Sequence, residues 1–359
     1  MRRSRWARGG RKAALLGSLA LLLSGCSASD WERNLRFGFP TGVTKQATRI
    51  RVLWTWSGVT ALVLGVVVWG LIFWCCLRYR KKSDDLPRQT KYNFTVEAVC
   101  FAFPFLVIAG LFYRTVIVED YVNKVTKNPD VTVQVDAFKW NWQFEYHTVK
   151  DASGKAQRKV YPGRTNLTDS SGTVQTRKDA ASGCGSAVGA TADACGGPNA
   201  DGQTSGPGPL YLSTVGSQNE IPILVVPVGK SVQVDEHSLD VIHSFWVPDF
   251  LFKRDVIPYG TTSTARDNKF EFTATTTGRF VGRCAELCGT YHSQMNFEVR
   301  VVPMSTFTAY LTALQKIGPD DPARQSKALA AAKMPAYATT TYPLTTDRNA
   351  RAASQKQGG

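Results

Sequence analysis

Cysteine, histidine and methionine side chains are concentrated in residues 284–295, which hold Cys284, Cys288, His292 and Met295. Thiolate and thioether sulfurs together with imidazole suit copper, whereas zinc sites rarely include Met and hard ions prefer carboxylates. A mononuclear copper site needs only one thiolate, so the second Cys predicts that two sulfurs bridge two copper ions. A further ligand must then come from another part of the chain.

His243 is the candidate for that ligand, because it follows an apolar pair at the end of a strand-like run. The run D-V-I-H-S-F-W-V-P (240–248) and the later run R-C-A-E-L-C-G-T-Y-H-S-Q-M (283–295) closely resemble subunit II of the haem-copper (cytochrome c) oxidases. That subunit carries a binuclear copper centre called CuA. The two motifs occur in the family's order, and the resemblance covers about residues 51–149 and 220–317.

The resemblance implies a complete ligand set for the centre. In the family, two cysteines bridge both copper ions, a histidine and the methionine complete one ion, and a histidine and a backbone carbonyl complete the other. The matching residues are Cys284 and Cys288 for the bridge, His243 and Met295 for one ion, and His292 and Glu286 for the other. The alternative for the two cysteines is a disulfide, because exported thiols tend to pair. The His and Met at the following spacings favour copper.

The resemblance also gives Glu286 a second role. Its carboxylate would help to hold a Mg2+ ion at the boundary with the catalytic subunit, since a hard cation prefers oxygen ligands. The alternative is a solvated loop residue of which only the carbonyl matters. His237 matches none of the family's ligands and is expected in a turn.

The amino end has the pattern of an export signal. Basic residues between positions 2 and 12 precede an apolar run at 13–23, which is too short to span a membrane. Leu-Ser-Gly-Cys at 23–26 resembles the bacterial lipobox, which predicts a signal peptide of residues 1–25 and a diacylglycerol anchor on Cys26. The alternative is an ordinary signal cleaved nearby.

Two apolar stretches, 52–77 and 94–118, are each long enough to cross a bilayer. The loop between them is rich in Arg and Lys, which places it in the cytoplasm by the positive-inside rule. The transmembrane hairpin 52–118 then leaves the segment 26–51 and everything after residue 118 on the outer face of a bacterial cell membrane. Much of the net charge of +15 comes from the signal and this loop, so a nucleic-acid partner has no support.

Glu97 is an acidic residue within the apolar part of the second stretch, and ionisable groups at membrane depth are costly and often functional. In the family a Glu at this spacing before a Pro, here Pro104, lies at the cytoplasmic mouth of a proton path. The resemblance therefore implies a proton-uptake role for Glu97. The alternative is a helix-end carboxylate that reaches the membrane surface.

Residues 119–317 read as an all-β domain. The run 131–138 alternates like a half-buried strand and is expected to continue with aromatic residues through 146. Further strands are expected at 221–228, 231–234, 269–273 and 296–302. A closing helix is expected at 305–317. This pattern predicts a Greek-key β-sandwich or barrel, and the resemblance implies a cupredoxin fold. Trp140 resembles the first Trp of the family's W-x-W, through which electrons enter. The alternative is packing.

Two other segments differ in composition from the rest of this domain. Residues 150–219 are rich in Gly, Ser, Thr, Ala and Asp, so we expect a low-complexity insertion without a packed core. Cys184 and Cys195 within it are expected to form a disulfide. The tail 318–359 is expected to be extended or disordered.

The function that the resemblance implies is electron transfer in a respiratory terminal oxidase. The subunit would take electrons from a soluble or membrane-fixed cytochrome c and pass them to haem in subunit I, where oxygen is reduced, with proton uptake and pumping. Oxygen is not reduced in this chain, because its four His residues lie outside both apolar stretches. The alternatives are a copper-free quinol oxidase subunit, which the ligand set argues against, and nitrous oxide reductase, which lacks this hairpin.

Overall fold

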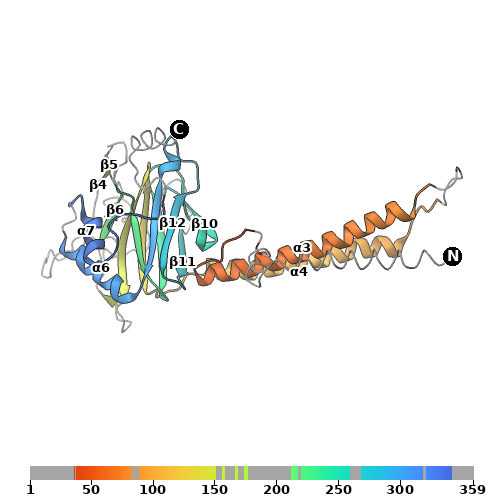
Figure 1. Cartoon of the computed structure of the whole chain (residues 1–359), viewed down its shortest axis with the longest axis horizontal. Coiled ribbons are helices and arrows are strands. Elements are labelled where there is room, and N and C mark those ends of the chain that lie inside the picture. Colours follow the sequence, from red (N-terminus) through yellow and green to blue (C-terminus); the bar gives the residue numbers. More distant parts are fainter. Residues whose placement is uncertain are drawn as a thin grey trace, which may run out of the picture. The chain divides into compact units, whose positions relative to one another are not determined.

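A computed structural model gives the fold of the chain (Figure 1). It describes residues 36, 38–81, 84, 89–150, 212–216, 220–258, 268–317 and 321–341, together with the backbone of the short strands β3 Ala156–Gln157, β4 Asn166–Thr168 and β5 Val174–Thr176. The chain divides into two compact units. One comprises Met1–Pro40 and Arg51–Arg114, and the other comprises Thr41–Ile50 and Thr115–Gly359.

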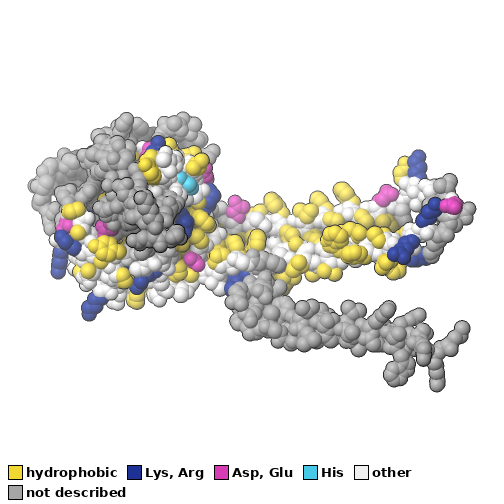
Figure 2. Space-filling view, turned by 45° about the horizontal axis from the view of Figure 1, so that its top comes forward, with side chains coloured by type: hydrophobic (Ala, Val, Ile, Leu, Met, Phe, Trp, Pro, Cys, Tyr) yellow, Lys and Arg dark blue, Asp and Glu magenta, His cyan; other side chains and the backbone are white. Residues whose placement is uncertain are grey.

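The two long helices are α3, Lys45–Arg78, and α4, Phe94–Asn123. Among the described residues they are the two helices that are long and apolar enough to cross a membrane. Figure 2 shows hydrophobic side chains along their outer surface and Lys and Arg side chains gathered at one end. Such a surface suits lipid rather than water, and both predicted membrane spans are confirmed as apolar helices.

The first turns of α3 extend beyond the predicted span because they belong to the β-rich unit. Thr44 caps the helix, with its hydroxyl accepting a hydrogen bond from the Ala47 N–H at 3.0 Å. The side-chain oxygen of Gln46 accepts a hydrogen bond from the Thr273 N–H at 3.1 Å. The polar start of α3 is therefore fixed by contacts that a hydropathy pattern does not reveal.

The β domain consists of two main sheets. The larger has the order β11-β8-β1-β2-β3, with β6 also paired to β2, and the other has the order β10-β9-β12-β13-β7. The strands of the first are β1 Val131–Phe138, β2 Asn141–Lys150, β6 Ser213–Val215, β8 Ser231–Ser238 and β11 Lys269–Thr273; those of the second are β7 Ile223–Pro227, β9 His243–Val247, β10 Phe252–Val256, β12 Gly278–Cys284 and β13 Asn296–Val302. The 3-10 turns η2 Pro248–Phe250 and η3 His292–Gln294 and the helices α6 Met304–Lys316 and α7 Arg324–Ala331 complete the described domain.

An aromatic cluster joins the two sheets in the core. The rings of Phe245 in β9 and Phe297 in β13 lie 4.5 Å apart, and Trp142 in β2 meets Phe297 edge-on at 5.1 Å. All three side chains are buried, and burying one such residue contributes about 1.5–3 kcal/mol. The predicted architecture, apolar helices followed by an all-β sandwich, is confirmed, as is the closing helix α6.

The prediction that the strand at 131–138 continues through residue 146 is wrong. The chain turns at Lys139 and Trp140, and β2 runs back antiparallel to β1 from Asn141. The Lys139 N–H donates to the Asp240 carboxylate at 2.7 Å, which fixes the turn. Trp140 therefore lies at the tip of a hairpin. His237 lies in strand β8 and is buried, so its predicted turn position is also wrong.

The predicted extended or disordered tail is wrong for residues 321–341. Helix α7 packs Ala328 and Leu329 into the core. The Gln325 side chain accepts a hydrogen bond from the Ile223 N–H at 2.8 Å and donates one to the Ile221 carbonyl at 2.9 Å. Gln325 thus satisfies backbone groups at the free edge of β7, which would otherwise be open to pairing with another chain.

The predicted insertion without a core is wrong at its carboxyl end. Strand β6 pairs with β2, and Leu212 beside it is buried among the core residues. Leu212 shows that a segment poor in large apolar residues still supplies one side chain to the core. Cys26, Cys184 and Cys195 lie outside the described residues.

Candidate copper centre

Neighbouring strands of the five-stranded sheet position the predicted ligands. His243 is the first residue of β9, and Cys284 is the last residue of its antiparallel neighbour β12. Cys288 follows in the connecting loop, His292 begins the turn η3, and Met295 directly precedes β13. Because β9 pairs with β12 and β12 with β13, motifs far apart in the sequence meet at one end of this sheet. The sequence had suggested that His243 ends a strand. In the structure it begins one.

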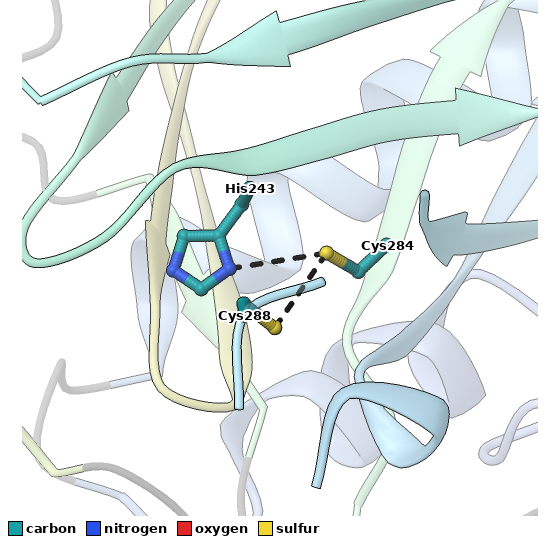
Figure 3. Close-up of side chains that lie close together, drawn as sticks. All are labelled: His243, Cys284 and Cys288. Carbon is teal, nitrogen blue, oxygen red and sulfur yellow. Dashed lines mark hydrogen bonds between the residues drawn. The ribbon is translucent and has the colours of Figure 1, made fainter. Parts of the chain in front are cut away.

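Figure 3 shows His243, Cys284 and Cys288 turned toward one another. The Cys284 Sγ lies 3.8 Å from the Cys288 Sγ and 3.9 Å from the His243 Nδ1. Within the described ranges these three side chains form a group of possible metal ligands, with ligand atoms within 4.8 Å of one another. Both cysteines are free thiols.

The remaining predicted donors surround the same two sulfurs. The Cys288 Sγ lies 3.5 Å from the His292 Nδ1 and 3.8 Å from the Met295 Sδ. The backbone oxygen of Glu286 lies 3.2 Å from the Cys284 Sγ. Donor atoms about 3–4 Å apart can share an ion whose bonds are about 2.0–2.3 Å long. The donor set and its spacing therefore fit a copper centre.

The site is enclosed by protein. Cys284, Cys288, Met295 and His243 are all buried, with exposed fractions of 7%, 4%, 1% and 0%. His292 is half-buried and lies nearer the surface. A set of soft donors removed from water favours copper over hard ions, which keep oxygen ligands and water.

Asp240 orients the His243 ring and was not predicted. Its Oδ1 lies 2.8 Å from the His243 Nε2, which leaves Nδ1 facing Cys284. The carboxylate also accepts hydrogen bonds from the backbone N–H groups of Lys139 and Val241. Burial raises the pKa of Asp240, but these hydrogen bonds outweigh it and the pKa is lowered. An acid three residues before a ligand His was the available signal, because ligating imidazoles commonly donate their second N–H to a carboxylate.

The two thiols have opposite pKa shifts. A hydrogen bond from the Cys288 thiol is the main cause that lowers the pKa of Cys284, to about 4. The same hydrogen bond, followed by burial, raises the pKa of Cys288. Burial lowers the pKa of His243, but hydrogen bonds to Asp240 and Cys284 outweigh it and the pKa is raised. Cys284 is therefore available as a thiolate ligand at neutral pH.

Replacing Asp240 with alanine should weaken copper binding by about 10- to 100-fold, the usual cost of losing a carboxylate behind a ligating imidazole. Asp240→Asn keeps an acceptor for the imidazole N–H and should lose less. Copper titration against a competing chelator measures both affinities. Wild-type affinity in Asp240→Ala would show that the carboxylate does not hold His243 for the metal.

Two tryptophans contact the backbone of the ligand loop. The Trp140 Nε1–H donates to the Cys288 carbonyl at 3.1 Å, and the buried Trp142 donates to the Met295 carbonyl at 3.3 Å. The ring of Trp140 also meets Tyr291 edge-on, with centroids 4.9 Å apart. The structure therefore brings the predicted Trp140 onto the copper loop.

Glu97 lies at the start of α4, where its carboxylate accepts a hydrogen bond from the Asn93 N–H at 3.0 Å. Asn93 reciprocates by accepting one from the Val96 N–H at 3.3 Å. Reciprocal contacts of this kind close a helix amino end. They match the helix-end alternative and leave a carboxylate that is exposed in the isolated chain.

Comparisons with known proteins point to one family. The family model described as "Cytochrome C oxidase subunit II, periplasmic domain" matches residues 215–302. The probable cytochrome c oxidase subunit 2 of Nocardia farcinica is 44% identical, and the match covers 95% of this chain and 89% of that protein. Cytochrome c oxidase subunit 2 of Mycobacterium bovis is 41% identical, with coverages of 94% and 88%.

A solved structure, the periplasmic domain of subunit II of cytochrome oxidase of Bradyrhizobium japonicum, matches 52% of this chain and 95% of its own, at 24% identity and a TM-score of 0.29. The matches to the curated relatives extend over nearly the whole chain, including the two helices and the ligand motifs. The predicted resemblance is confirmed. The chain belongs to the cytochrome c oxidase subunit II family.

Proposed function

We propose that this subunit of a terminal oxidase is the point at which electrons from cytochrome c enter the enzyme. From here they pass to haem in subunit I, where oxygen is reduced with proton uptake and pumping. One observation carries this proposal: two imidazoles, a thioether and a backbone carbonyl converge on two cysteine sulfurs that lie 3.8 Å apart. A copper-free quinol oxidase subunit has no use for this donor set.

The ligand assignment is the one that the family resemblance implies, and the contacts among the donors support it. Cys284 and Cys288 would be the thiolate ligands shared by two copper ions, and the copper pair would supply a centre that takes up one electron at a time. His243 and Met295 would be the further ligands of one ion, and His292 with the Glu286 carbonyl would be those of the other. The chain's own part is to keep these donors in place: antiparallel strands hold the ends of the loop, and burial excludes water. Little then has to rearrange when the charge of the site changes.

Trp140 is the proposed surface contact for the electron donor. It is half-buried at a hairpin tip, and its indole N–H reaches the backbone of the bridging Cys288 at 3.1 Å. The side chain therefore links the solvent side of the domain to a ligand through one hydrogen bond.

Trp140→Phe removes this N–H, so the aromatic ring is no longer held against the Cys288 carbonyl. A displacement of about 1 Å costs about 10- to 100-fold in rate, and electron transfer from reduced cytochrome c should slow by that factor. Copper content should not change. Stopped-flow absorbance measures the rate, and a small inorganic reductant, which needs no docking site, serves as the control. Wild-type transfer from cytochrome c in this variant would remove Trp140 from the path and with it the proposed point where electrons enter.

The proposed membrane topology has the copper domain and the amino end on the outer face of the cell membrane, with Cys26 lipidated. The support is the sequence order of signal, basic loop and two apolar helices. Labelling of intact cells with a lysine-reactive reagent that cannot cross membranes tests the orientation. Modification of lysines in the loop 79–93 instead of those in the β domain would reverse it.

Glu97 is proposed to take up protons at the cytoplasmic mouth of a path shared with subunit I. Glu97→Gln keeps the size and an acceptor for the Asn93 N–H but cannot ionise. It should slow reduction of the catalytic haem in the assembled oxidase while copper is still reduced at its normal rate. Stopped-flow spectra follow the two centres separately. Wild-type rates at both would leave Glu97 as a helix-capping residue alone.

The carboxylate of Glu286 is proposed to hold Mg2+ at the boundary with subunit I. The support is its place between the two bridging cysteines, where its own carbonyl faces Cys284 and its side chain is only half-buried. Magnesium analysis of an oxidase assembled with Glu286→Gln tests this, because an unchanged magnesium content would leave the side chain without this role.

A further inference from the structure

Tyr291 lies inside the ligand loop, between Cys288 and His292, and belongs to no ligand set. Its half-buried ring meets the Trp140 ring edge-on, with centroids 4.9 Å apart and planes at 78°. The two residues come from different sheets, since Trp140 is at the β1–β2 turn and Tyr291 follows β12. This contact therefore joins the hairpin tip to the copper loop.

The loop that carries the candidate ligands contacts Trp140 through Cys288, Gly289 and Tyr291. On one side the indole N–H donates to the Cys288 carbonyl at 3.1 Å. Beneath the ring lies Gly289, where an added Cβ would stand 3.2 Å from the Trp140 Cζ2 and where a φ of +117° already disfavours other residues. The Tyr291 ring makes the third contact, edge-on to the indole. The absence of a side chain at Gly289 lets the indole approach, and the Tyr291 ring limits where it can go.

Tyr291 is itself held by the loop backbone. The Gln294 N–H donates to the Tyr291 carbonyl at 2.9 Å, and the His292 N–H donates to the Gly289 carbonyl at 3.1 Å. These bonds form the turn that also presents the His292 imidazole to Cys288. The position of Tyr291 is thus set by the same turn that sets a ligand, and the Trp140 ring is aligned to that turn.

We infer that Tyr291 is a positioning residue for electron transfer through Trp140, holding the indole in hydrogen-bonding contact with the Cys288 carbonyl. This inference rests on the proposed function. At the hairpin tip the indole meets the ligand loop through this ring pair and through its hydrogen bond to the Cys288 carbonyl. An edge-to-face aromatic pair favours its packed arrangement by about two- to tenfold. Loss of the Tyr291 ring should lower, by that factor, the fraction of molecules in which the Trp140 indole contacts the Cys288 carbonyl.

Three variants of the full chain test this. Tyr291→Ala removes the ring, Tyr291→Leu replaces it by a non-aromatic side chain, and Tyr291→Phe is the matched control that loses only the hydroxyl. Tyr291→Ala and Tyr291→Leu should lower the maximal rate of electron transfer from reduced cytochrome c by about two- to tenfold. The KM for cytochrome c, the copper spectrum and the rate with a small inorganic reductant should stay unchanged. Tyr291→Phe should behave as the wild type.

Several outcomes would overturn the inference. A wild-type rate in Tyr291→Ala would do so, as would a slow Tyr291→Phe or a rise in KM alone, since both assign Tyr291 to contact with the donor. Loss of copper in both Tyr291→Ala and Tyr291→Leu would assign it to the ligand loop instead.

The double variant separates this inference from the proposed function. In a Trp140→Phe background, Tyr291→Ala should slow transfer no further, because both changes act on one route. If Trp140→Phe alone transfers electrons at the wild-type rate, the proposed role of Trp140 fails. If Trp140→Phe is slow and Tyr291→Ala is not, only the role of Tyr291 fails.

Discussion

Replacing Cys288 with serine is expected to abolish the binuclear centre. Electron transfer from cytochrome c should fall by more than about 100-fold, because losing even a group that only supports a metal ligand costs up to about 100-fold. Its sulfur lies within 3.8 Å of three other donors, on Cys284, His292 and Met295. A serine hydroxyl is a hard oxygen that suits copper poorly. One thiolate then remains, which supports a single copper at most.

Copper analysis and visible absorption measure this effect in the purified chain. Thr290→Ser is the matched control, because Thr290 is an exposed residue of the same loop. The control should keep the wild-type copper content and spectrum. Two coppers with an unchanged spectrum in Cys288→Ser would show that Cys288 does not bridge.

Glu298→Ala should destabilise the β domain by about 3–5 kcal/mol, the usual cost of breaking a buried ion pair from one side. Glu298 and Arg300 are both buried in β13, with Oε1 and Nε 2.7 Å apart. The other carboxylate oxygen accepts the N–H groups of Thr339 and Thr340 at 2.7 and 2.8 Å. The variant leaves the buried Arg300 guanidinium without a carboxylate, although it still donates to the Pro335 and Tyr337 carbonyls, and it removes the acceptor of the Thr339 and Thr340 N–H groups.

The loss can be tested against a double variant. Glu298→Leu combined with Arg300→Met replaces the pair by apolar side chains and should recover most of the stability. Thermal unfolding followed by near-ultraviolet circular dichroism compares the two. A Glu298→Ala variant as stable as the wild type would show that the pair does not anchor the tail.

The same pair predicts a pH dependence. Burial alone raises the pKa of Glu298, but the Thr339 N–H, Arg300 and Thr340 outweigh it and the pKa is lowered. A lowered folded-state pKa stabilises the domain above the unfolded value of about 4.3, and this stability is lost as pH falls through the folded value. The melting temperature of the wild type should therefore fall more steeply in acid than that of the double variant.

Local patterns predicted much of the chain. The sequences at 131–138, 269–273 and 296–302 alternate between polar and apolar residues over enough positions to be recognised as strands. The long apolar helices carry their own signal, since lipid-facing side chains need no partner within the chain. The donor side chains that the structure brings together were recognised because soft donors at short spacings are rare and chemically specific.

What the sequence did not reveal depends on contacts between distant segments. Strand β12 was missed because Gly278 and Gly282 stand where a strand pattern has large apolar residues, on the face opposite the exposed Arg279 and Arg283. Helix α7 was missed because it has few large apolar residues and is fixed by buried polar side chains. One of these, Arg324, donates to the Ser213 and Leu314 carbonyls, and no periodicity predicts such partners.

Asp240 was missed for a related reason. A carboxylate near a ligand His is visible in the sequence, but its role follows from the pairing of β9 with β12 and from the turn after β1, which determine the direction of the imidazole. Long-range pairing of this kind is what the sequence pattern leaves open.

We propose that this chain holds two coppers bridged by Cys284 and Cys288. Copper analysis of the fully loaded, folded chain, combined with electron paramagnetic resonance, tests it most directly. We expect two coppers per chain and a multi-line signal from one unpaired electron shared by both ions. One copper per chain, or two coppers with separate single-ion signals, would contradict the claim.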